Sequence, residues 1–243
     1  MINILLTGIG GQGTVLAAKL LASAASAHGW QVRSAETIGM AQRGGSVTSH
    51  VRIAGVSVSA VVGENTVRAC DTTAIDSSNS APCEQVFSSL IPLGSADLIV
   101  AFEPAEAARV LPYLAPAGTL VTATSDIQPV TVALSGVEYS SEKVIADIRE
   151  SLRADDANTR SESSDAPVQH RKSPAPKFIP VNDAEILREV GNSRTLNTVL
   201  LTIALSTGAV PLTIDDLKDA VRACVKPQFV DLNLRAVDIA LRA

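Results

Sequence analysis

The chain has 243 residues, of which 46% are hydrophobic, 19% charged and 3% aromatic, and its formal net charge is −5. This size is enough for one large globular domain or two small ones. An acidic chain with few aromatic rings lacks the basic surface and the stacking side chains of a nucleic-acid binder, so we expect no nucleic-acid partner.

The three cysteines, Cys70, Cys83 and Cys224, form no Cys-x-x-Cys pair. They predict neither a disulfide framework nor a cysteine-ligated zinc or iron–sulfur site within this chain. The run after Met1 resembles a strand with no basic segment before it, and no apolar stretch approaches the ~18 residues of a membrane span. We therefore expect a cytoplasmic chain that does not enter a membrane.

The N-terminal residues predict a strand, a glycine-rich turn, a helix and a second strand. Ile2 to Leu6 is a short apolar run typical of a buried parallel strand. The helix is predicted to start at Thr14 as its N-cap and to stop at Gly29, and Trp30 to Ser34 is the next strand. This order favours a right-handed βαβ unit and an α/β class.

The middle of the chain predicts a second β-α-β step. A helix opens at Glu103-Pro104, because proline suits the first helical turn. Weaker patterns predict a strand or hairpin arm at 56–62 and a loop at 71–81. The predicted strands of this part are Val47–Ile53, Leu98–Phe102 and Gly118–Thr122.

Residues 151–177 lose hydrophobic periodicity and are rich in Ser, Asp, Arg, Ala and Pro. This composition predicts a flexible surface insert that is partly disordered. After it, four segments have helical spacing, with Thr213 and Asp216 placed as a capping box: Asp183–Val190, Leu196–Ser206, Ile214–Ala223 and Phe229–Arg242. Residues 1–243 thus predict a single domain with a Rossmann-like, open, mostly parallel sheet, flanking helices and a helical C-terminal region.

The segment Gly8-Ile9-Gly10-Gly11-Gln12-Gly13 has Gly-x-Gly-x-x-Gly spacing between a strand and a helix. Glu36 follows near the place of a ribose-binding acid, which favours a dinucleotide site. The alternative is that the glycines only permit close packing of strand and helix, and that Glu36 is a plain strand-end acid. The motif alone leaves both interpretations open.

Four blocks resemble the gamma subunit or gamma domain of 2-oxoacid:ferredoxin oxidoreductases, most closely the beta subunit of the indolepyruvate type. The first is the glycine segment above. The others are Gly39-Met40-Ala41-Gln42-Arg43-Gly44-Gly45 with Ser49-His50-Val51-Arg52, Ser95-Ala96-Asp97-Leu98 with Phe102-Glu103-Pro104 and Leu111-Pro112-Tyr113-Leu114, and Gly191-Asn192 with Arg194 and Asn197. Residues 56–86 and 151–177 are longer than the family pattern.

The resemblance implies a complex that cleaves a 2-oxoacid oxidatively with thiamine diphosphate, magnesium, iron–sulfur clusters, coenzyme A and ferredoxin. This chain has no cluster-binding cysteine run and no Gly-Asp-Gly segment, so it is expected to hold none of these cofactors alone. The expected partner is the thiamine-bearing subunit, with ferredoxin reached through the complex, and the isolated chain is expected to be inactive. A homodimer of the isolated chain stays open, and an aryl pyruvate is the favoured substrate.

No catalytic or metal-ligating residue is expected in this chain. Arg43 could hold a phosphate or carboxylate in a fork, or form a salt bridge to a partner subunit. His50 is expected to be a hydrogen-bonded structural or interface residue. The predicted cofactor-binding or interface residues are Gly8, Gly10, Gly11, Gln12, Gly13, Gln42, Arg43, Gly44, Gly45, Ser49 and His50. A stand-alone NAD(P)- or flavin-binding oxidoreductase and a ligand-free scaffold remain alternatives.

Overall fold

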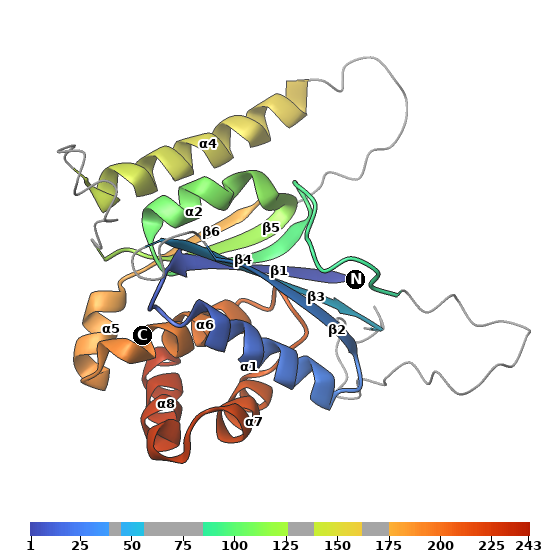
Figure 1. The fold of residues 1–243 in the computed structure, drawn as a ribbon. Coiled ribbons are helices and arrows are strands. Elements are labelled where there is room, and N and C mark those ends of the chain that lie inside the picture. Colours follow the sequence, from blue (N-terminus) through green and yellow to red (C-terminus); the bar gives the residue numbers. More distant parts are fainter. Residues whose placement is uncertain (39–44, 56–84, 126–138, 162–174) are drawn as a thin grey trace, which may run out of the picture.

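The computed structural model describes residues 1–38, 45–55, 85–125, 139–161 and 175–243, and of Ile38 and residues 155–161 only the backbone. In these ranges a six-stranded sheet has helices on both faces (Figure 1). The strands are β1 (Ile2–Ile9), β2 (Gln31–Ile38), β3 (Ser46–Ala54), β4 (Ala96–Ala101), β5 (Leu114–Ala123) and β6 (Lys177–Val181).

The order across the sheet is β2-β3-β1-β4-β5-β6. Strands β1, β4, β5 and β6 pair in parallel, while β3 is antiparallel to both β1 and β2. The predicted α/β class with a mostly parallel sheet is therefore confirmed. The first βαβ unit differs from the prediction in one respect, because β3 pairs between β1 and β2 and separates two strands that point the same way.

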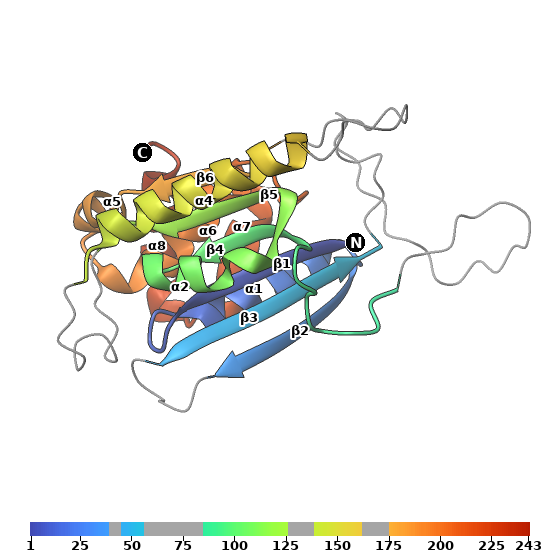
Figure 2. The same ribbon diagram turned by 90° about the horizontal axis from the view of Figure 1, so that it is seen from above.

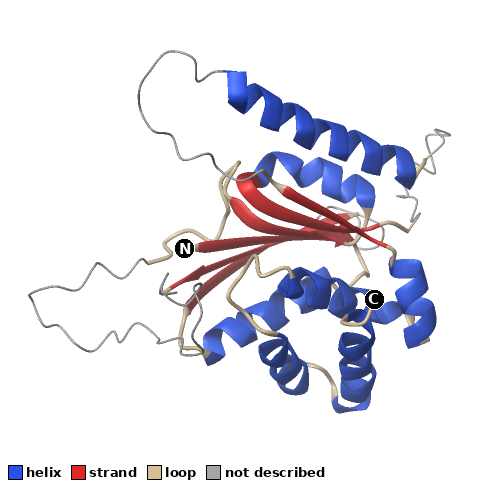
Figure 3. Cartoon of the chain, turned by 180° about the vertical axis from the view of Figure 1, so that it is seen from behind, coloured by secondary structure: helices blue, strands red, loops and turns tan. Residues whose placement is uncertain are grey.

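Helices of the described residues cover both faces of the sheet (Figure 3). On the first face lie α1 (Thr14–Ala27), α5 (Asp183–Val190), α6 (Leu196–Ser206), α7 (Ile214–Cys224) and α8 (Pro227–Ala240). On the second face lie α2 (Pro104–Val110) and α4 (Ser141–Ser161), which cover the β4 to β6 half while β2 and β3 extend beyond them (Figure 2). Short 3-10 turns occupy Leu111–Tyr113 and Ser193–Thr195.

Alternation along the strands builds two cores, one on each face of the sheet. Leu6 and Val51 are fully buried in the larger core, together with Leu200 of α6. Leu5 and Ile99 point the opposite way into the smaller core, which α2 and α4 close. Since successive strand residues face opposite sides, a doubly covered sheet needs the continuous apolar runs that the sequence contains.

Several local predictions about helix ends are confirmed and one is wrong. Gly29 adopts a φ of 73° just after α1, and Thr213 with Asp216 forms the capping box of α7. Thr14 is not the N-cap of α1, because Gly13 takes that position and Thr14 is the first helical residue. None of the helices in the described ranges combines the length and the apolar character that crossing a membrane requires.

The predicted flexible insert at 151–177 is wrong over 151–161, which continue helix α4. Val144, Ile148 and Leu152 are spaced four residues apart and pack on the smaller core, so an amphipathic stripe anchors this helix. Strand β6 then starts at Lys177. Residues 162–174 lie outside the described residues, as do the patterns predicted at 56–62 and 71–81.

Candidate functional site

The candidate site lies where the neighbouring parallel strands β1 and β4 end. After β1 the chain enters α1 on one face of the sheet, and after β4 it enters α2 on the other face (Figure 1). Such a reversal creates a crevice at the carboxyl ends of the strands, where open α/β folds bind their ligands. The glycine segment Gly8–Gly13 and the segment Phe102–Glu106 meet at this edge.

The glycine loop is closed by hydrogen bonds within the chain. The backbone N–H of Ile9 donates to Oε1 of Gln12 at 2.7 Å, and that of Gly10 donates to the carbonyl of Gly45 at 2.8 Å. The Gln12 amide Nε2 donates to the carbonyl of Phe102 at 3.1 Å, which ties the loop to the end of β4. A phosphate needs free N–H groups, and three N–H groups of this loop, those of Ile9, Gly10 and Gln12, already have acceptors.

Close packing explains two of the glycines. A Cβ at Gly8 would lie 2.6 Å from Gln12 Oε1 and 2.9 Å from Phe102 Cδ2. Gly13 has a φ of 85°, and a Cβ there would lie 2.8 Å from Nδ2 of Asn197. The interpretation in which these glycines permit close approach of neighbouring segments therefore has a direct physical basis.

A buried carboxylate caps α2 beside the loop. Glu103 is 0% exposed, and its Oε2 accepts a hydrogen bond from the backbone N–H of Glu106 at 2.9 Å. Its Oε1 accepts a hydrogen bond from the hydroxyl of Tyr139. Burial raises the pKa of Glu103, and the hydrogen bond from Tyr139 opposes that rise in part.

Glu106 joins α2 to the end of β1 and to the start of β3. Its Oε2 accepts hydrogen bonds from the hydroxyl of Ser46 at 2.6 Å and from that of Thr7 at 3.4 Å. Nη2 of Arg109 lies 3.4 Å from Oε1 of Glu106. The side chain of Glu106 is 2% exposed, so the site contains two buried carboxyl groups with specific donors. These two carboxyl groups disfavour a further acidic group, such as a pyrophosphate, in the same crevice.

His50 and Ser49 lie inside the sheet rather than beside the glycine loop. His50 is buried, and its Nδ1 accepts a hydrogen bond from the N–H of Ile91 at 3.3 Å. Its ring meets the ring of Tyr113 edge-on at 6.0 Å, and burial lowers the pKa of His50. Ser49 is 0% exposed, and its hydroxyl has no hydrogen-bond partner among the described residues. The geometry of His50 is that of a hydrogen-bonded core residue.

Glu36 lies on β2 and is exposed, with β3 between it and β1. Two strand spacings, about 10 Å in total, therefore separate its strand from the glycine loop. A ribose-binding acid stands on the strand next to the glycine segment, so this placement favours the plain strand-end interpretation. Gln42, Arg43 and Gly44 lie outside the described residues, whereas Gly45 is described and binds Gly10.

Sequence reasoning missed the polar cluster of Thr7, Ser46, Glu103 and Glu106. The available signal was an acid directly after a buried strand, followed by Pro104 and a second acid. Carboxyl ends of parallel strands are where such acids meet a neighbouring loop. Within the described ranges, no group of three His, Cys, Asp or Glu side chains is arranged to hold a metal ion.

With this fold and this strand-end site, comparisons with known proteins define the class. The chain belongs to the pyruvate ferredoxin/flavodoxin oxidoreductase family, whose model matches residues 3–78 and 75–243. A relative from Pyrococcus horikoshii, indolepyruvate oxidoreductase subunit IorB, is 31% identical over 242 residues, which are 99% of this chain and 95% of the relative. The resemblance predicted from the four sequence blocks is confirmed.

Solved structures of low sequence identity share the fold. The gamma subunit of a keto/oxoacid ferredoxin oxidoreductase from Geobacter sulfurreducens aligns with a TM-score of 0.55 at 18% identity, covering 100% of this chain and 97% of that one. Subunit PORC of the pyruvate oxidoreductase from Thermotoga maritima aligns with a TM-score of 0.55 at 18% identity, covering 99% and 95% of the two chains. These relatives are subunits of oxidoreductases.

Proposed function

We propose that this chain is the subunit that holds no cofactor in a 2-oxoacid:ferredoxin oxidoreductase acting on an aryl pyruvate of the indolepyruvate type. The complex then carries out a thiamine-dependent oxidative decarboxylation to an acyl-CoA, with thiamine diphosphate, magnesium and iron–sulfur clusters held by other subunits. Support for this assignment comes from the similarity to IorB proteins, which extends over almost the whole chain.

The closed glycine loop is the observation that carries the role of the site. Gln12 and Gly45 accept hydrogen bonds from loop N–H groups, and two buried carboxyl groups lie at the same edge. A surface of this kind is suited to protein contact rather than to a pyrophosphate. We assign the edge formed by Gly8–Gly13 and Gly45 to the interface with the thiamine-bearing subunit. In this proposal Arg43, which precedes Gly45 by two positions in the sequence, contacts that subunit or coenzyme A.

Replacement of Arg43 tests this role. Arg43→Ala is expected to weaken assembly with the thiamine-bearing subunit, or to raise the KM for coenzyme A, while the free energy of unfolding of the isolated chain stays unchanged. Truncation of one partner in an interfacial charge pair commonly costs ~2–5 kcal/mol. Calorimetry of assembly and steady-state kinetics with a viologen acceptor measure the two effects. Arg188→Ala, an exposed arginine on α5, is the matched control.

Two results would contradict the proposal. The first is an Arg43→Ala complex that assembles and turns over like the parent. The second is turnover of a 2-oxoacid by the isolated chain, because the proposal leaves it without cofactors.

Titration of the isolated chain with NAD and NADP tests the dehydrogenase alternative, in which a ligand at ~100 times its Kd stabilises the fold by about 2.7 kcal/mol. We expect no such stabilisation.

A further inference from the structure

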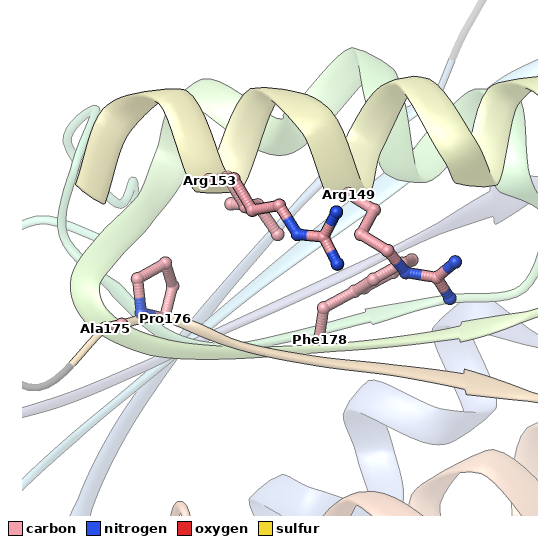
Figure 4. A pocket seen from close by; sticks show the side chains of 6 residues that line it. Arg149, Arg153, Ala175, Pro176 and Phe178 are labelled. Atoms are coloured by element: carbon pink, nitrogen blue, oxygen red, sulfur yellow. The ribbon is translucent and has the colours of Figure 1, made fainter. Parts of the chain in front are cut away.

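A hollow of about 280 Å³ lies between helix α4 and the start of strand β6 (Figure 4). Its lining residues are Arg149, Leu152, Arg153, Ala175, Pro176 and Phe178. The hollow is at the amino end of β6, whereas the glycine loop and Glu103 are at the carboxyl ends of the parallel strands. It is therefore separate from the candidate site described above.

Two guanidinium groups stand on one side of this hollow. Arg149 and Arg153 are four residues apart on α4, so both project from the same helix face, as Figure 4 shows. Both are exposed, and neither has a carboxylate within ion-pairing distance among the described residues. Like charges at this spacing repel each other, although the chain as a whole has a net charge of −5. A bound anion would relieve this repulsion.

The rest of the hollow is apolar. Arg149 lies over the ring of Phe178, with its guanidinium carbon 5.8 Å from the ring centroid. Leu152 and Pro176 complete a surface without charged groups, since Leu152 is 9% exposed and packs on the smaller core. Such a wall favours a flat apolar body, because it offers contact area but no hydrogen-bond partner from these side chains.

We propose that this hollow is a binding site for a small organic anion in which a carboxylate or phosphate group is attached to an aromatic body. The anionic group is held by the two guanidinium groups, whose planar donors match both oxyanions. The aromatic body lies against Leu152, Pro176 and Phe178. A volume of about 280 Å³ is suited to a ligand of one or two rings and is too small for a folded segment of another protein.

Calorimetric titration of the full chain at low ionic strength tests this site, with phenylacetate and phenyl phosphate as probes. We expect saturable binding of at least one of them. The double variant Arg149→Gln, Arg153→Gln is expected to weaken that binding by about tenfold or more, because hydrogen bonds to charged groups are lost. Arg188→Gln, which removes the same charge from an exposed position on α5, is expected to leave the affinity unchanged.

The remaining arms separate the head group from the aromatic body. The tighter of the two probes identifies carboxylate or phosphate as the preferred head group, and inorganic phosphate alone is expected to bind at least tenfold more weakly than that probe. Phe178→Leu is a second variant, which removes the aromatic ring and leaves every charge in place. It is expected to weaken binding of the aromatic probes severalfold. The proposal is overturned if neither aromatic anion saturates, if the double variant retains full affinity, or if inorganic phosphate binds as tightly as the aromatic probes.

Discussion

Two strand-to-helix junctions lie next to each other at one edge of the sheet and are built in opposite ways. Gly13 precedes α1 with a φ of 85° and provides no side-chain cap. Glu103 precedes α2 in extended backbone, and its carboxylate caps the N–H of Glu106. The first junction depends on partners from distant segments, since Gln12 binds Phe102 and Asn197 lies against Gly13. The second is capped within one helical turn.

The difference teaches where each kind of junction gets its stability. A glycine junction brings backbone segments close together, so its cost in conformational entropy must be offset by tertiary contacts. At an acidic junction the carboxylate accepts a hydrogen bond from the helix that it precedes, and the positive end of the helix dipole stabilises its negative charge. The cost is the burial of a carboxylate. Variants at the two junctions should therefore respond differently in stability and in pH dependence.

The largest effect is expected for Gly13→Ala. A non-glycine residue at positive φ costs roughly 1–2 kcal/mol, and contact of the new Cβ with the amide of Asn197 adds about 1–2 kcal/mol. The free energy of unfolding, measured by urea denaturation, should fall by about 2–4 kcal/mol in total. Gly11→Ala is the matched control, because Gly11 has a φ of 107° but no heavy atom within 4 Å of the added Cβ.

If Gly11→Ala and Gly13→Ala destabilise equally, backbone strain alone explains both and the contact with Asn197 contributes nothing. A loss of only about 1–2 kcal/mol for Gly11→Ala, against a larger loss for Gly13→Ala, supports the dependence on the distant helix α6.

The next effect concerns the acidic junction. Glu103→Ala removes the acceptor of the Glu106 N–H and of the Tyr139 hydroxyl. Loss of a cap and of a buried hydrogen bond predicts a decrease of about 2 kcal/mol in the free energy of unfolding. Glu189→Ala on α5 is the control, because this exposed acid should change stability by less than about 0.5 kcal/mol. Equal effects of the two variants would remove the role given to Glu103.

The smallest effect is a pH dependence that belongs to the acidic junction. Burial raises the pKa of Glu103 in the folded state above its ordinary value of 4.5, so the folded chain binds this proton more tightly than the unfolded chain. The contribution of Glu103 to stability is then greatest at low pH and decreases as the pH rises from 4.5 through the raised value. Denaturation curves between pH 4.5 and 7 should show that the stability of the parent relative to Glu103→Gln decreases as the pH rises.

His50 adds a pH dependence of the free energy of unfolding with the opposite sign. Because the parent and Glu103→Gln both contain His50, the difference between their stabilities does not include this contribution. Burial lowers the pKa of His50, so its contribution to stability is lost as the pH falls below its ordinary value of 6.5. Parallel stability curves for the parent and Glu103→Gln over the whole range would contradict the effect assigned to Glu103.

The sequence predicted most elements but placed some ends incorrectly. Pro104 and the capping pair Thr213 and Asp216 predicted the starts of two helices, because these signals act within one turn. The prediction of a loop that starts at residue 151 is wrong over 151–161. The helix there depends on a few side chains, such as Ile148 and Leu152, that pack on a sheet built from distant segments. Helices of this kind are stabilised by tertiary contact more than by propensity.

The sequence alone was sufficient for the α/β class, the glycine junction after β1 and the helical C-terminal region, because short-range periodicity and motif spacing carry this information. The family followed from the resemblance of four sequence blocks to known members. Only the tertiary structure decided that β3 pairs between β1 and β2, and that the loop N–H of Ile9 is bonded to Gln12, whose amide reaches Phe102, 90 positions away. The buried environment of Glu103 and Glu106 was likewise decided by tertiary structure. Strand order and buried hydrogen bonds depend on which distant segments meet, and no local pattern contains that information.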